Sequence, residues 1–346
     1  MLLLLLYPCV PLLLPWPLSH TCHRLAHELR FYNLNAPQLD KRLRPAEPDY
    51  RLVLVGGECS GSGPSLSAWL QCFDDKACGW GRLEDMSVER PNTCGAAAVG
   101  SCLFAWGGEG LSVETPGFMS MYDLASRKVA ELARPPRPLA FTTGVACCGL
   151  VYCLGGLDMA EGVQVADMCT YNPELDTWVP GLPLPFAVEG IAAAEYAGSI
   201  YACGGTMLDG VTRSHALLLM DPRTRAWAAL PSMLTPTAYT GAAMVEGRLY
   251  VPGGRSSDPS ILQCYDVAAG RWDTNCPPMV EARASPGVGA LRGEVWAVGG
   301  EYDRSGFDDY VGLASVEVYS PRLNTWREAV SLPYPCFDCT CVVVQC

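Results

Sequence analysis

Short apolar stretches alternate with polar turns along the chain, and the same order of stretches returns about every fifty residues. In six places an apolar stretch ends on two glycines, and the first glycines of these pairs are 51, 48, 49, 49 and 46 residues apart. A repeat of this length is typical of an array of similar structural units. The six stretches are LVLVGGE (Gly56), LFAWGGE (Gly107), VYCLGGL (Gly155), IYACGGT (Gly204), LYVPGGR (Gly253) and VWAVGGE (Gly299).

Each unit predicts four antiparallel strands in two hairpins. The first hairpin turns at a single glycine, six or seven residues before the pair in five units, because a tight hairpin turn requires a positive φ. Its first strand is small and apolar, as in GAAAV at 95–99, which is expected of strands crowded around a central axis. In the second hairpin an aromatic residue or Met precedes a Trp by seven residues. The pairs are Phe73 and Trp80, Tyr171 and Trp178, Met220 and Trp227, Tyr265 and Trp272, and Tyr319 and Trp326.

The glycine pairs and the Trp residues are expected to serve the packing of one unit against the next. At the glycine pair, a side chain is expected to collide with the neighbouring unit. The Trp is expected to be buried and to fill the space between units. Unit two keeps the spacing but has Val129 where the others have Trp.

Tandem units with a glycine pair followed by Tyr and Trp at a fixed spacing resemble kelch repeats, over roughly residues 50–346. The resemblance implies an all-β fold, a six-bladed kelch β-propeller of four-stranded antiparallel blades. A WD40 propeller is the competing array, but its Gly-His signature is absent. The last strand, within CTCVVVQ at 339–345, is expected to pair with residues 51–55 and to close the ring in blade one.

The N-terminal part is expected to consist of two further segments. Residues 1–21 are apolar and are either signal-like or a remnant, since Pro8, Pro11 and Pro15 interrupt them. Residues 22–49 are expected to form a short helix and a linker that resemble the end of a BACK domain. The chain therefore resembles a truncated member of the BTB-BACK-kelch family that lacks the BTB domain.

Charge narrows the range of partners. The net charge of −12 and the scattered Lys and Arg residues argue against nucleic acid, and they favour neutral or basic partners. With four His and no nucleophile beside a base, the sequence indicates neither an enzyme nor a bound cofactor. A membrane partner is not expected either, because prolines break the apolar N-terminal run.

The 18 cysteines leave two interpretations open. Several fall in predicted strands, where a free thiol behaves as a small buried hydrophobe. The alternative is a metal site, but neither candidate stretch has a matching second half, so no metal is predicted. The candidate stretches are CFDCTC (Cys336, Cys339, Cys341) and HTCHRLAH (His20, Cys22, His23, His27).

The loops that follow each glycine pair and those that link consecutive units are expected on one face, where they bind a protein or peptide. Arg and Tyr are the usual anchors of such interfaces, and an acidic peptide would pair with the arginines. The expected binding residues are Arg255, Arg283, Tyr302, Arg304, Asp258, Arg90, Asn92, Arg137, Phe186, Tyr239 and Tyr334.

The resemblance to kelch-like adaptors also implies a function. In that family the propeller selects the substrate of a cullin-RING E3 ubiquitin ligase, and the BTB domain recruits the cullin. This function places the chain in the cytoplasm. An actin-associated kelch scaffold and a secreted kelch binding protein, the latter with residues 1–20 as a signal peptide, remain alternatives.

Overall fold

The repeated turn signals divide the chain into short strands. The computed structural model describes residues 49–58, 70–74, 79–83, 93–109, 117–303 and 310–346. Within these ranges every regular element is a strand. Among them there is accordingly no helix with the length and apolar character to cross a membrane.

The described strands form six four-stranded antiparallel sheets, or blades. Blade one joins the two ends of the described chain, and the other five each follow the order of the sequence. From the innermost strand outward, the blades are β31 (Thr340–Gln345), β1 (Tyr50–Val55), β2 (Leu70–Asp74) and β3 (Gly79–Leu83); β4 (Gly95–Val99), β5 (Cys102–Trp106), β6 (Met119–Asp123) and β7 (Lys128–Glu131); β9 (Thr143–Cys147), β10 (Leu150–Leu154), β13 (Met168–Asn172) and β14 (Thr177–Pro180); β16 (Ala192–Tyr196), β17 (Ser199–Cys203), β19 (Leu217–Asp221) and β20 (Ala226–Leu230); β21 (Ala243–Val245), β22 (Arg248–Pro252), β23 (Leu262–Asp266) and β24 (Arg271–Asp273); β25 (Gly287–Leu291), β26 (Glu294–Val298), β29 (Val316–Ser320) and β30 (Thr325–Ala329).

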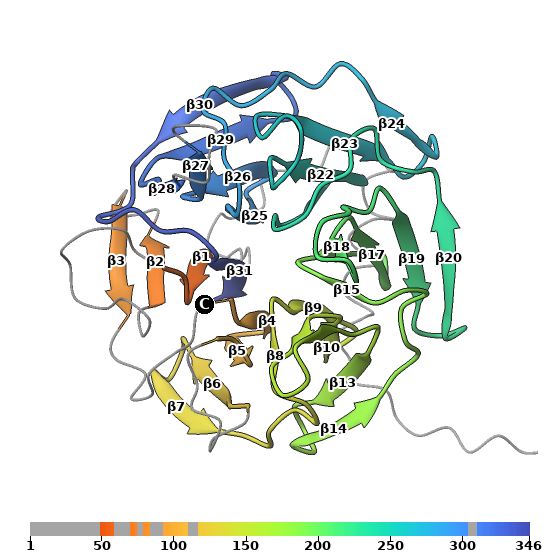
Figure 1. Cartoon of the computed structure of the whole chain (residues 1–346). Helices are drawn as coiled ribbons and strands as arrows, with labels where there is room; N and C mark the ends of the chain where they lie inside the picture. The colour runs from red at the N-terminus through yellow and green to blue at the C-terminus, as the bar shows by residue number, and fades with distance from the viewer. Residues whose placement is uncertain (1–48, 59–69, 75–78, 84–92, 110–116, 304–309) are drawn as a thin grey trace, which may run out of the picture. The chain divides into compact units, whose positions relative to one another are not determined.

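The innermost strands β31, β4, β9, β16, β21 and β25 surround a common axis. Each contacts the next in this order, and β25 contacts β31 again. Figure 1 shows the blades radiating from this centre. The inner strands are rich in Ala, Gly and Val, as expected, because large side chains would not fit where six strands converge.

Seven shorter strands lie in the loops beyond the glycine pairs and in the linkers between blades. They form small ribbons of two or three strands, so these loops are anchored to the linkers by backbone hydrogen bonds. The ribbons are β12 (Val163–Gln164), β11 (Leu157–Asp158) and β8 (Leu139–Ala140); β15 (Val188–Glu189) and β18 (Thr206–Met207); and β27 (Glu301–Asp303) and β28 (Tyr310–Gly312).

The glycine pairs have the role expected from the sequence. Both glycines of every pair have positive φ. In blade four, a Cβ on Gly204 would lie 2.4 Å from the carbonyl oxygen of Thr237, in the linker to the next blade. The N–H of Gly205 donates to that same oxygen at 2.9 Å. The close approach is therefore part of the contact between blades, and it excludes any side chain at Gly204.

The seven-residue spacing places the aromatic residue or Met directly opposite the Trp on the two outer strands of a blade. Tyr171 faces Trp178 in the register of β13 and β14, and their rings are 5.1 Å apart. Tyr171 is fully buried, whereas Trp178 is only half-buried. The expectation of a buried Trp is therefore wrong: the inner member of each pair fills the core, and the Trp covers it from the outermost strand.

Each of these Trp residues makes a hydrogen bond to the preceding blade, which explains why a polar aromatic residue stands on the outermost strand. The indole Nε1 donates to a carbonyl oxygen of the segment that leaves that blade. The bonds are Trp80 to Val330 (2.9 Å), Trp178 to Ala133 (2.8 Å), Trp227 to Leu182 (3.1 Å), Trp272 to Pro231 (2.8 Å) and Trp326 to Pro277 (3.0 Å).

Replacing Trp178 by Phe keeps the contact with Tyr171 and removes only the hydrogen-bond donor. We expect the free energy of unfolding to fall by about 1 kcal/mol, the usual contribution of one such bond. Urea unfolding followed by fluorescence measures this change. An unchanged unfolding midpoint would show that the bond between blades does not contribute to stability.

The ring closes as predicted. All six residues of β31 pair with β1, from Tyr50 opposite Gln345 to Val55 opposite Thr340. Beyond the pair of Tyr50 and Gln345, the N–H of Cys346 donates to the carbonyl oxygen of Asp49 at 2.6 Å. The expected N-terminal segments, residues 1–21 and 22–49, lie outside the described residues except for Asp49.

Candidate functional site

Six residues with a left-handed backbone form a ring around the axis, one at the end of each linker, just before the innermost strand. Their φ values lie between 49° and 62°. Since a non-glycine residue rarely adopts such a φ, its recurrence at equivalent positions indicates that the geometry of the linker imposes it. These residues, here called the mouth ring, are Thr93, Phe141, Gly190, Tyr239, Ser285 and Asp338.

Backbone hydrogen bonds connect neighbouring members of the mouth ring. In each bond the N–H of one member donates to the carbonyl oxygen of the member before it. The five bonds are Phe141 to Thr93 (3.0 Å), Gly190 to Phe141 (2.9 Å), Tyr239 to Gly190 (2.9 Å), Ser285 to Tyr239 (2.9 Å) and Asp338 to Ser285 (3.3 Å). They fix the linkers relative to one another and hold the side chains of the ring at defined positions.

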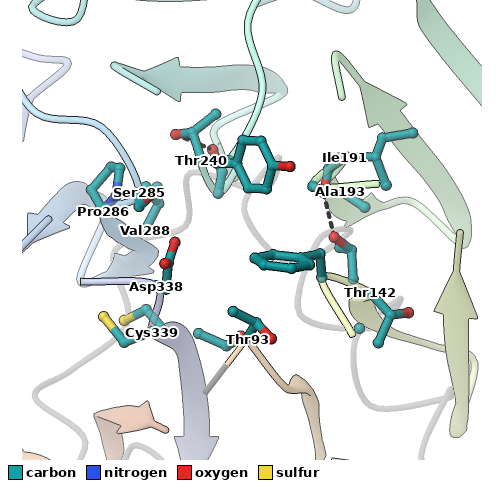
Figure 2. A pocket seen from close by; sticks show the side chains of 18 of the residues that line it. Thr93, Thr142, Ile191, Ala193, Thr240, Ser285, Pro286, Val288, Asp338 and Cys339 are labelled. Carbon is teal, nitrogen blue, oxygen red and sulfur yellow. Dashed lines mark hydrogen bonds between the residues drawn. The ribbon is translucent and has the colours of Figure 1, made fainter. Parts of the chain in front are cut away.

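The mouth ring surrounds a cavity of about 130 Å³ on the axis. In Figure 2, Asp338 and Ser285 lie on one side of the opening, and Ile191, Ala193 and Thr142 lie on the other. Phe141, Tyr239 and Thr93 also line it. The cavity is the size of a side chain and combines aromatic rings, hydroxyl groups and one carboxyl group.

Tyr239 is the centre of a cluster on the rim of this cavity. The guanidinium carbon of Arg255 lies 4.6 Å from the centroid of the Tyr239 ring. The ring of Phe141 meets it edge to face at 5.4 Å. The Tyr239 hydroxyl donates to Oε1 of Glu189 at 2.7 Å. Burial and then this bond raise the pKa of Tyr239, so the phenol stays protonated at neutral pH.

Arg255 is held in place by an ion pair. Its Nη2 lies 3.0 Å from Oε1 of Glu301, and the Ser285 hydroxyl donates to the same oxygen at 3.3 Å. Burial alone would lower the pKa of Arg255, but the bond to Glu301 raises it. The positive charge of Arg255 is therefore already paired in the folded protein.

The carboxyl group of Asp338 has a perturbed pKa. Burial raises it to about 6; a hydrogen bond with Ser285 and the charge of Arg255 oppose the rise, and the charges of Glu301 and Glu58 add to it. A group that is half-buried and faces other carboxylates is destabilised when it ionises.

This shift determines how stability depends on pH. The pKa of Asp338 in the folded protein is higher than the ordinary value of 3.8, so the folded state binds the extra proton between about pH 4 and pH 6. The contribution of Asp338 to stability therefore falls as the pH rises through this range. We expect Asp338→Asn to unfold at higher urea concentration than the wild type at pH 7, by on the order of 1 kcal/mol, with no difference below about pH 4. A variant that is less stable than the wild type at pH 7 would contradict the assignment.

Other carboxylates gather near the rim. Glu109 has a raised pKa, first because it is partly buried and then because Glu58 and Glu189 are close enough to repel it. Glu189 is buried, and its Oε2 has no hydrogen-bond partner among the described residues. The rim is thus predominantly negative, which is consistent with the acidic composition of the chain.

Of the binding residues expected from the sequence, the structure brings Tyr239 and Arg255 together at the mouth. Arg283 does not belong there. It is completely buried, and its guanidinium donates to the carbonyl oxygens of Gly299 (2.7 Å) and Ser315 (3.1 Å) and pairs with Glu317 (2.7 Å). The expectation of an exposed anchor is wrong for Arg283, because the linker turns this side chain inward to satisfy backbone and carboxylate oxygens of blade six.

The other expected residues are spread over the loops. Arg137 makes ion pairs with Asp158 (2.8 Å) and Asp167 (3.0 Å), and Asp258 accepts hydrogen bonds from Ser260 within its own loop. The remaining described residues are partly buried Phe186 and Tyr302 and exposed Tyr334. Arg90, Asn92 and Arg304 lie outside the described residues.

The structure describes fourteen cysteines, eight of them buried. Cys336 and Cys339 pack in the core between blades six and one. In the ranges that the structure describes, no three His, Cys, Asp or Glu side chains gather as metal ligands. His20, Cys22, His23 and His27 lie outside these ranges.

Four members of the mouth ring were not singled out from the sequence, namely Thr93, Gly190, Ser285 and Asp338. A positional signal exists for the first three, because five members of the ring stand fourteen residues before the first glycine of the next pair, as Thr93 does before Gly107 and Ser285 before Gly299. Asp338 has no later pair. It joins the ring only because β31 closes blade one.

Similarity to known proteins agrees with this architecture. The family model of the kelch motif matches residues 282–333. Kelch-like protein terF of Aspergillus terreus is 24% identical over 77% of this chain and 62% of its own length. An F-box/kelch-repeat protein of Arabidopsis thaliana is 32% identical over 61% of this chain and 54% of its own length. The chain is a kelch-repeat protein.

Two further matches show the extent of the kelch similarity. Kelch-like protein 36 of Rattus norvegicus is 23% identical over 82% of this chain and 47% of its own length. The solved structure of YjhT superposes with a TM-score of 0.65 at 15% identity, covering 75% of this kelch chain and 89% of its own. The chain thus spans less than two thirds of each of these three curated relatives, whereas YjhT is similar in fold along most of its length.

Proposed function

We propose that this kelch propeller is the substrate-recognition part of a cullin-RING E3 ubiquitin ligase adaptor and that it binds a protein substrate on the face that carries the mouth ring. The kelch-like relatives and the propeller fold support a protein-interaction domain. The adaptor role follows from the resemblance to kelch-like adaptors. The same proposal places the chain in the cytoplasm, with the secretory pathway as the alternative if residues 1–20 are a signal peptide.

The observation that carries the binding face is an exposed apolar loop beside the mouth. Leu208 and Val211 lie in the loop that begins with β18, and they are 66% and 76% exposed. The loop is anchored because Thr206 pairs with Glu189 in the linker. Exposed apolar side chains on an anchored loop are typical of surfaces that bind proteins.

The test is a pull-down with two matched double variants. The first variant, Leu208→Ser with Val211→Ser, replaces exposed apolar residues on the proposed binding face. The second, Leu175→Ser with Leu323→Ser, replaces similarly exposed apolar residues in turns at the other end of the blades. We expect the first variant to lose at least about tenfold in recovery of the main partner and the second to retain it. Equal recovery with both variants would place the binding surface elsewhere.

The ligase role requires a second measurement. If the captured partner is a ubiquitination substrate, depleting this protein from cells will lengthen the half-life of the partner and reduce its ubiquitin conjugates. A partner whose turnover does not change would leave the chain a binding protein without the adaptor role.

A further inference from the structure

The cavity inside the mouth ring has polar groups whose hydrogen-bonding capacity is unused. Thr93 lines the cavity and is 7% exposed, yet its hydroxyl has no hydrogen-bond partner among the described residues. A buried hydroxyl without a partner is costly, so any rearrangement that brings a donor to it would be favourable. Figure 2 shows Thr93 beside Asp338 at the edge of the opening.

The charges around the cavity indicate the sign of that group. Asp338 is influenced by the negative charges of Glu301 and Glu58 and by the positive charge of Arg255. Arg255 is already paired with Glu301 at 3.0 Å, so its charge is largely compensated before it can neutralise Asp338. A second positive charge in the cavity would be favourable.

Of the arginines expected to attract an acidic peptide, the three that the structure describes are not available for that purpose. Arg283 is buried against Glu317, Arg255 is bound to Glu301, and Arg137 is held by Asp158 and Asp167. An acidic segment would have to displace these carboxylates and would also meet Asp338 at the mouth. The geometry therefore favours the opposite charge on the partner.

We propose that the mouth ring binds one cationic side chain, Arg or Lys, of an extended segment of the protein partner; this inference rests on the proposed function. The cation lies against the aromatic rings of Phe141 and Tyr239 and opposite the carboxylate of Asp338. The cavity of about 130 Å³ has room for a side chain of this kind.

Fluorescence anisotropy with the full chain tests the proposal. The probes are labelled glycine-serine peptides that carry arginine, lysine or glutamate at alternate positions. We expect the two cationic peptides to bind and the glutamate peptide not to bind. Asp338→Asn should weaken binding of the cationic peptides about tenfold, whereas Glu328→Gln, which removes an equal charge from exposed β30, should leave it within about twofold.

The pH dependence provides a second readout. Asp338 loses its charge below about pH 6, with Glu301, Glu58 and Arg255 as the charged groups that act on it. Binding of the arginine peptide to the wild type should weaken between about pH 7 and pH 5, and binding to Asp338→Asn should change little. Because Asp338→Asn is expected to stabilise the fold, a loss of binding in this variant cannot be attributed to unfolding.

Three results would overturn the inference: binding of the glutamate peptide as tight as that of the arginine peptide, an equal loss in Asp338→Asn and Glu328→Gln, or no binding of either cationic peptide at about millimolar concentration. Failure of the proposed function would look different: the Leu208 and Val211 variant and the Leu175 and Leu323 variant would recover the captured partner equally. If the captured partner is lost with the Leu208 and Val211 variant but retained with Asp338→Asn, the binding face stands and only the cationic side chain is wrong.

Discussion

Replacing Gly204 by alanine is expected to lower the free energy of unfolding by about 4 kcal/mol. The added Cβ would lie 2.4 Å from the carbonyl oxygen of Thr237, which already accepts a hydrogen bond from Gly205. Neither backbone segment can move without separating two blades. The φ of 73° adds the strain of a left-handed conformation.

Gly210 provides the matched control because its φ of 70° is nearly the same, but a Cβ there meets no atom within 4 Å. Gly210→Ala should therefore lower the free energy of unfolding only by the cost of the left-handed backbone, about 1 kcal/mol. Urea unfolding of both variants separates the steric contribution from the φ contribution. Equal losses in the two variants would show that the close approach between blades does not determine stability.

Replacing Val344 by aspartate is expected to have a comparable effect, a loss of about 4 kcal/mol or failure to fold. Val344 is completely buried in β31, opposite Arg51 of β1, and it packs in the core between blades one and two. A carboxylate at this position would lose its hydration in the apolar core, and a pair with Arg51 on the opposite strand would not recover that loss. The strand that closes the ring would then detach.

The next residue serves as the control, since Gln345 is exposed on the same strand. Gln345→Asp introduces an equal charge at the surface, and we expect it to change stability by less than about 0.5 kcal/mol. Unfolding measured by circular dichroism and limited proteolysis of the C-terminal residues distinguish the variants. A folded Val344→Asp variant with an intact C-terminus would mean that closure contributes little.

The sequence predicts most of the fold because each blade repeats a local pattern. The glycine spacing, the hairpin glycines and the pairing of Tyr171 with Trp178 depend on contacts within one unit or between neighbouring units, and the repeat reveals them. The Trp residues are less buried than the sequence indicated. The seven-residue spacing identifies the two residues that face each other, but it does not show which of them lies on the outermost strand. The closing strand could be predicted because the first unit lacks its small inner strand, and the last strand of the chain supplies one.

The candidate site was harder to predict because it depends on where the linkers place their side chains. Arg255 follows the glycine pair of blade five and Arg283 lies in the linker to blade six, yet one reaches the rim and the other is buried against Glu317. Residue type alone does not distinguish them. Asp338 joins the mouth ring only through closure, so its proximity to Thr93 is a property of the complete ring rather than of any one repeat.

The closure of blade one has a mechanical consequence. Asp49 and Cys346 stand at the same end of the pair formed by β1 and β31, where Tyr50 faces Gln345. A force applied between these two residues would act first on the terminal hydrogen bonds and open the pair one rung at a time, like a zipper. Strands that resist pulling share the load across all rungs at once, so the propeller is expected to be weakest when stretched from its own ends.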